Sequence, residues 1–79
     1  MASEHIEALD MVANGDWDGA HQLIQEIHDE LACRIHGYLH IVEGDFGNAA
    51  YWYNKVGEDV PESDPEQELQ RLLGMALPD

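Results

Sequence analysis

The stretch "NGDWDGAHQLIQEI" (14–27) recurs in altered form 29 positions later as "EGDFGNAAYWYNKV" (43–56). In both copies a Gly-Asp pair precedes an aromatic residue, and alanine follows three positions after the aromatic. Glycine readily adopts the left-handed conformation that ends a helix, and aspartate accepts hydrogen bonds from the free N–H groups that open the next helix. Each copy therefore predicts a helix, a Gly-Asp corner and a second helix.

The rest of the chain extends this pattern to five helices. Asp29 is suited to cap a third helix after a link of about two residues. The segment "SDPEQE" (63–68) begins a last helix, because it offers an N-cap aspartate, a proline at the first helical position and the glutamine of a capping box. The expected helices are 3–14, 16–28, 30–43, 45–56 and 65–77.

These helices predict one all-α domain over residues 1–79. Repeat 1 covers about 3–28, and repeat 2 covers about 30–56. The segment at about 65–77 lacks a partner helix, so we expect it to be a capping helix that covers the exposed end of the core.

The second unit resembles the tetratricopeptide repeat (TPR), a helix-turn-helix unit of 34 residues. The matching positions are Gly37, Gly44, Asp45, Phe46, Ala49, Tyr53 and Pro61. The first unit matches less fully, through Ala8, Gly15, Asp16, Trp17 and Ala20. The resemblance implies two helical hairpins in a right-handed α-α superhelix and a role in protein binding. Here the period is 29, and His36 and His40 replace the leucine and tyrosine usual in that family.

The stretch "RIHGYLHIVEGDFGNAAYWYNKVGEDVP" (34–61) is also similar to small uncharacterised bacterial proteins with the pattern "HxYLHxxEGD…NAxYWY". That similarity implies a bacterial source and no particular activity.

The charge of the chain restricts its partners. The chain has seventeen aspartates and glutamates but only three basic residues (lysine plus arginine), which gives a formal net charge of −14. Such a surface repels nucleic acids and anionic membranes and suits a basic protein partner, although an acidic solvated surface needs no partner at all. No apolar run approaches the roughly 20 residues of a membrane span. The single cysteine, Cys33, and the absence of a visible signal peptide predict a cytoplasmic protein.

The aromatic triplet Tyr51, Trp52 and Tyr53 cannot all face one core, because neighbours on a helix are about 100° apart. Tyr53 lies close in angle to Ala49 and is expected in the core. Trp52 lies at the edge of that face, and Tyr51 points outward. Tyr51 and Trp52 are therefore candidate anchors for a protein partner or a homodimer. The simpler interpretation of Tyr51 is a single exposed ring.

Four histidines suggest an alternative function. His36 and His40 are four residues apart on one expected helix, and His21 and His28 are seven apart on the preceding one. Because a short turn makes these helices antiparallel neighbours, all four rings are expected along one groove. Neutral imidazoles in such an arrangement bind zinc or copper, and Glu43 is placed to add an oxygen ligand.

The sequence favours packing over metal binding, since HxxxH alone is a weak signal. In that interpretation the rings are partly buried and hydrogen-bonded to a carboxylate or a tyrosine. No nucleophile elbow, phosphate loop or dinucleotide fingerprint is present. We therefore expect no enzyme activity and no cofactor. The main prediction is a protein–protein interaction module, and the alternative is a small metal-binding protein that uses His21, His28, His36 and His40.

Overall fold

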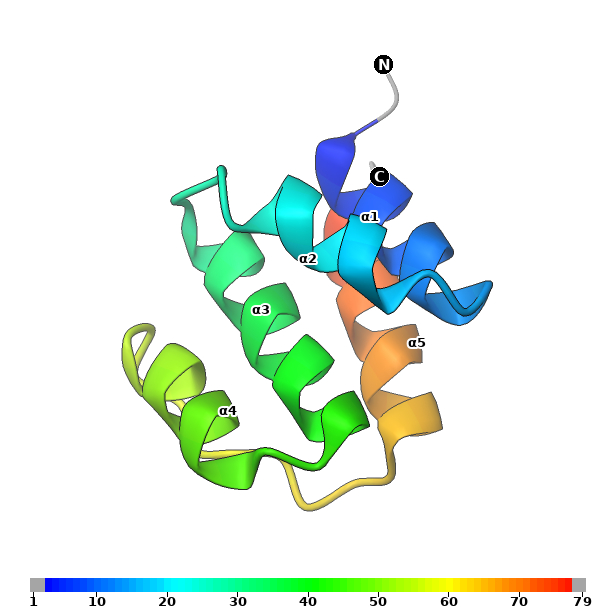
Figure 1. The fold of residues 1–79 in the computed structure, drawn as a ribbon. Coiled ribbons are helices and arrows are strands. Elements are labelled where there is room, and N and C mark those ends of the chain that lie inside the picture. The colour runs from blue at the N-terminus through cyan, green and yellow to red at the C-terminus, as the bar shows by residue number, and fades with distance from the viewer. Residues whose placement is uncertain (1–2, 78–79) are drawn as a thin grey trace.

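The computed structural model describes residues 3–77. Within them the chain forms only α-helices, connected by turns and a loop, and none of these residues lies in a strand. The helices are α1 (Glu4–Ala13), α2 (Trp17–Ile24), α3 (Glu30–Glu43), α4 (Phe46–Asn54) and α5 (Pro65–Ala76) (Figure 1). The prediction of an all-α chain is confirmed for this part. Between residues 3 and 77, no helix combines the length and apolar character that a membrane crossing requires.

The two Gly-Asp corners have the same hydrogen bonds. Gly15 and Gly44 adopt left-handed conformations with φ of 89° and 86°. Asp16 and Asp45 cap the helices that follow, each accepting from the backbone N–H three residues further on. In both corners the aspartate N–H donates to the carbonyl five residues earlier at 2.8 Å. The repeated sequence therefore forms a repeated local structure, because the same residue types satisfy the same free helix ends.

Helix α2 ends at Ile24 and not near residue 28 as predicted. Beyond it, the N–H of Ile27 donates to the carbonyl of Ile24, three residues earlier, so the chain tightens into a turn. Asp29 then caps α3 as expected, and its carboxylate accepts from the N–H of Ala32 at 2.8 Å. Residues 25–28, which were expected in the second helix, belong to this turn and the link after it. His28 therefore lies outside α2.

The helices pack as two pairs with a fifth helix laid across them. α1 packs against α2, α3 packs against α4, and α2 also contacts α3. α5 lies against α1 and α3 and does not pack along α4 (Figure 1). The main core cluster consists of Ala8, Leu9, Ala20, Ile24, Ala32, Ile35, Tyr38, Leu39, Leu69 and Leu72. The last helix thus covers the core across the first helices of both units.

The aromatic residues that follow the two Gly-Asp corners, Trp17 and Phe46, differ in their burial. Trp17 is half-buried, and its indole N–H donates to the carbonyl of Leu39 in α3 at 2.7 Å. Phe46 is 59% exposed. Trp17 packs on the first helix of the following unit. The described chain offers Phe46 no corresponding helix, because α5 packs on α1 and α3.

A polar network, buried at Tyr53 and Glu68 and open to solvent at Arg71, fixes α5 to the rest of the molecule. Tyr53 donates its hydroxyl to Glu68 at 2.7 Å, and Arg71 donates to the same carboxylate at 2.8 Å. Glu58, in the loop before α5, binds both Arg34 and Arg71 at 3.1 Å. Burial and the bond to Glu68 raise the pKa of Tyr53. The network occupies two of the three basic side chains of the protein.

Candidate functional site

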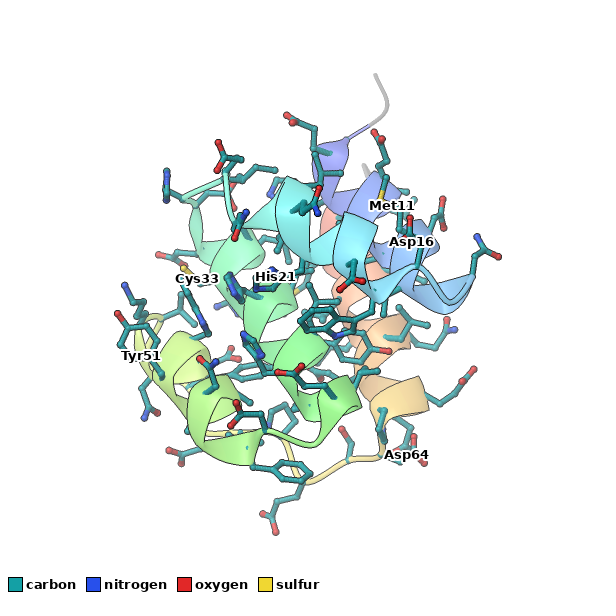
Figure 2. All side chains as sticks on the ribbon, viewed as in Figure 1. Met11, Asp16, His21, Cys33, Tyr51 and Asp64 are labelled. Atoms are coloured by element: carbon teal, nitrogen blue, oxygen red, sulfur yellow. The ribbon has the colours of Figure 1, made fainter. Side chains whose placement is uncertain are left out.

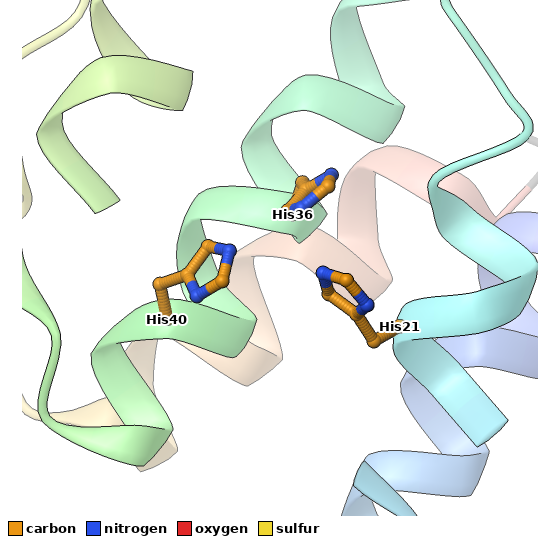
Figure 3. A group of neighbouring side chains, drawn as sticks. All are labelled: His21, His36 and His40. Atoms are coloured by element: carbon orange, nitrogen blue, oxygen red, sulfur yellow. The ribbon is translucent and has the colours of Figure 1, made fainter. Parts of the chain in front are cut away.

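Three imidazole rings meet between α2 and α3. Figure 3 shows His21 from α2 pointing toward His36 and His40 on α3. One nitrogen from each ring lies within 4.8 Å of those of the other two. His36 and His40 are only 6% and 5% exposed, and His21 is half-buried. We call these three residues the histidine cluster.

Helical spacing and the crossing of two helices produce this geometry. His36 and His40 are one turn apart, and their ring centroids are 5.0 Å apart. The centroid of His21 lies 4.7 Å from that of His36 and 5.5 Å from that of His40. His28 was expected in the same groove, but it is exposed and lies outside the cluster because α2 ends before it. The structure therefore brings together three of the four expected rings.

The hydrogen bonds leave two of the rings open. Nδ1 of His40 lies 2.7 Å from Oε1 of Glu43, a pairing in which the imidazole N–H donates to the carboxylate. The rings of His21 and His36 have no hydrogen-bond partner within residues 3–77. No side-chain nitrogen or oxygen of that range is both fully buried and unpaired. The open ring nitrogens of His21 and His36 therefore still touch solvent.

Burial keeps His36 neutral. Desolvation, and then the proximity of His21 and His40, lower the pKa of His36 to about 4. At neutral pH this imidazole therefore carries no charge, and one of its nitrogens presents a lone pair.

Two tryptophans form walls of the cluster. Trp17 stacks on His21 with centroids 4.9 Å apart and an angle of 9° between the rings. Trp52 stacks on His36 at 3.8 Å and 12°. These are the only two tryptophans in the chain, so its tryptophan fluorescence reports on the histidine cluster.

The aromatic triplet has the predicted orientations. Tyr53 is fully buried, Trp52 is half-buried, and Tyr51 is 56% exposed at the side of α4 (Figure 2). The ring of Tyr51 meets that of Trp52 edge-on at 5.2 Å. The ammonium of Lys55 lies 4.9 Å from the centroid of Tyr51 and 5.0 Å from that of Trp52. We call Tyr51 and Trp52 the aromatic pair.

Sequence reasoning did not assign Trp17 to the histidine cluster or Lys55 to the aromatic pair. A signal for both was present. Trp17 precedes His21 by four residues and Lys55 follows Tyr51 by four, and residues four apart on a helix are neighbours on its surface.

No protein-family model, curated protein or solved structure matches this chain.

Proposed function

We propose that the chain is a two-unit helical repeat of the TPR kind that binds a basic segment of another protein through Tyr51 and Trp52. It performs no catalysis and acts in the cytoplasm of a bacterium. The observation that carries the proposal is the aromatic pair, in which a ring left 56% exposed stands against a second, anchored ring.

Rigidity favours the aromatic pair as an anchor. Trp52 is held from below by its stack on His36, and Tyr51 is held edge-on against Trp52. Aromatic side chains have few rotatable bonds and bury a large area, so they lose little entropy when a partner binds. Rings that are already fixed in place lose even less.

Lys55 indicates what chemistry the pair accepts. Its ammonium lies within about 5 Å of both ring centroids, the range in which a cation is attracted to the face of an aromatic ring. A lysine or arginine of a partner can take the same position when Lys55 moves aside. The pair therefore suits a cationic segment.

The overall charge favours the same partner. Arg34 and Arg71 are engaged in ion pairs with Glu58, and the chain as a whole carries a net charge of −14. Such a field steers basic partners toward the surface and suppresses contact with acidic ones. A second copy carries the same charge, which is why we propose a basic partner over a homodimer.

The two matching corners support the repeat interpretation, as does the packing of α1 on α2 and of α3 on α4. The position of α5 has a further consequence for this class of fold. It lies against the first helices of both units, so the outer face of those helices is not available to a partner. The aromatic pair on α4 lies on a different helix and remains accessible.

The test is a comparison of two exposed aromatics. Wild-type protein, Tyr51→Ser and Phe46→Ser serve as baits for a bacterial extract. Phe46 is as exposed as Tyr51 but lies outside the aromatic pair. We expect a basic protein that wild type and Phe46→Ser retain and Tyr51→Ser loses. Titration of that protein should show an affinity about tenfold or more weaker for Tyr51→Ser, and an affinity that falls as salt is added.

Equal binding by Tyr51→Ser and wild type would contradict the proposal. So would a partner that is acidic, or a salt-independent affinity. Light scattering across a concentration range measures whether the protein self-associates. A dimer that forms in wild type and is lost in Tyr51→Ser would mean that the aromatic pair binds a second copy of the chain and not a basic partner. Trp52→Ala is a poorer variant here, because it also removes the stack on His36.

A further inference from the structure

We propose that His21, His36 and His40 form a binding site for a divalent transition-metal ion of the zinc class. The three imidazoles supply the protein ligands, and a fourth coordination position stays open to water or an exchangeable ligand. The metal ligands lie between α2 and α3, whereas the aromatic pair lies on α4 and meets the cluster only through the stack of Trp52 on His36.

The distances bring the three nitrogens near the geometry that such an ion requires. Zinc binds imidazole nitrogen at about 2.0–2.1 Å, so the nitrogens of a tetrahedral site are about 3.3 Å apart. In the cluster the distance between any two of the three nitrogens is at most 4.8 Å. A bound ion would draw these nitrogens closer by up to about 1.5 Å, through rotation of the rings about their side-chain bonds.

The rings of His21 and His36 leave nitrogens that no other group in the described part of the chain occupies. His36 is 94% buried, since only 6% of it is exposed, and yet its ring has no hydrogen-bond partner within residues 3–77. The His21 ring is open in the same way, and the open nitrogens still reach solvent, so an ion has access to both.

Glu43 acts as a positioning residue in this site. Its carboxylate accepts from Nδ1 of His40 at 2.7 Å, which leaves the Nε2 lone pair of that ring free for a metal. Metal-binding histidines characteristically have such an outer carboxylate, which fixes the ring and raises its basicity. The surrounding rings of Trp17 and Trp52 limit access by bulk water, and the negative field of the protein concentrates cations near the site.

The chemistry of the ligands selects the metal class. Three imidazoles suit zinc, copper or nickel, whereas calcium and magnesium prefer oxygen ligands. A site of three histidines with an open position is typical of zinc sites that exchange a ligand.

The test is calorimetric titration of the metal-free protein with Zn²⁺, in excess Mg²⁺ to saturate weak carboxylate sites. We expect one Zn²⁺ per chain with a dissociation constant in the micromolar range or tighter. His36→Gln should weaken binding at least about 100-fold, and Glu43→Gln roughly 10–100-fold. The matched controls are His28→Gln, an exposed histidine outside the cluster, and Glu62→Gln, an exposed loop carboxylate, and both should bind like wild type.

Fluorescence gives a second readout. Because each tryptophan stacks on a cluster histidine, Cu²⁺ at one equivalent should quench both Trp17 and Trp52, and a chelator should restore the signal.

If circular dichroism shows that His36→Gln does not fold, His21→Gln is the deciding variant, since His21 is only half-buried. Zn²⁺ binding no tighter than millimolar, or binding that survives both cluster variants, would overturn the proposal.

Discussion

At the scale of single residues, His36 is a nearly buried imidazole that contacts the partly exposed ring of Trp52. Its ring stacks under Trp52, faces His21 and His40, and is almost fully buried. A neutral imidazole fits this environment, whereas a charged one would lose its hydration and meet two other histidines. Protonation of His36 therefore opposes folding.

We predict that the metal-free protein loses stability as the pH falls from about 6.5 to about 4. In the unfolded chain His36 binds a proton near pH 6.5, but in the folded protein its pKa is lowered to about 4. Between these values the unfolded state holds about one more proton, so the free energy of unfolding decreases with falling pH. Above pH 6.5 the contribution is complete and constant.

Urea denaturation at several pH values, with a chelator present, measures this effect. His28→Gln should keep the wild-type slope between pH 6.5 and 4. A variant with His36→Gln that folds and shows that same slope would assign the pH dependence to other groups.

At the scale of elements, the approach of α3 to α4 depends on Gly37. A Cβ atom at this position would lie 2.6 Å from ring carbons of Tyr53 and 3.1 Å from the carbonyl oxygen of Ala49. Tyr53 is fully buried and held by its bond to Glu68, so its ring cannot easily move aside. The absence of a side chain at Gly37 lets the two helices come together.

We predict opposite effects for two Gly→Ala substitutions within helices. Gly37→Ala should destabilise the protein by about 1–2 kcal/mol, because overpacking outweighs the better helix propensity of alanine. Gly74→Ala in α5 meets no atom within 4 Å and should stabilise the protein by up to about 1 kcal/mol. Chemical denaturation midpoints measure both changes. A neutral Gly37→Ala would mean that the contact of α3 with α4 is looser than the structure has it.

Local chemistry made much of the fold predictable. The caps at Asp16, Asp29, Asp45 and Asp64 and the glycine corners act within a few residues, so the sequence alone locates the helix starts. Contacts between distant elements were not predictable in this way. The early end of α2 lacks a glycine signal, and the exposure of Phe46 depends on where α5 packs.

The candidate site was predictable to a similar extent. The directions of Tyr51, Trp52 and Tyr53 followed from helical angles alone. The grouping of His21 with two rings on α3 followed from a short link between antiparallel helices. The position of His28 outside the group could not be predicted from the sequence, because it depends on where α2 ends.

At the scale of the whole molecule, charge opposes compactness. The protein carries a net charge of −14, and two of its three basic side chains are held in one network with Glu58 and Glu68. The remaining carboxylates repel one another across a small surface, and this repulsion is relieved when the chain unfolds.

We predict that salt stabilises the protein. Raising NaCl from 10 to 150 mM shortens the screening length from about 30 to about 8 Å, which weakens long-range repulsion more than the short ion pairs. The melting temperature should rise by several degrees, since about 1 kcal/mol corresponds to about 4–8 °C in a domain of this size. Scanning calorimetry at constant pH measures it. A fall in melting temperature would mean that the Glu58 network dominates.

The position of α5 also determines when the protein can fold during synthesis. Leu69 and Leu72 complete the core between α1 and α3, so a nascent chain that lacks them leaves apolar side chains of both earlier helices uncovered. Residues that are still inside the ribosome cannot dock. The hairpins can form as they emerge, but the stable core closes only after the segment up to residue 76 has left the exit tunnel.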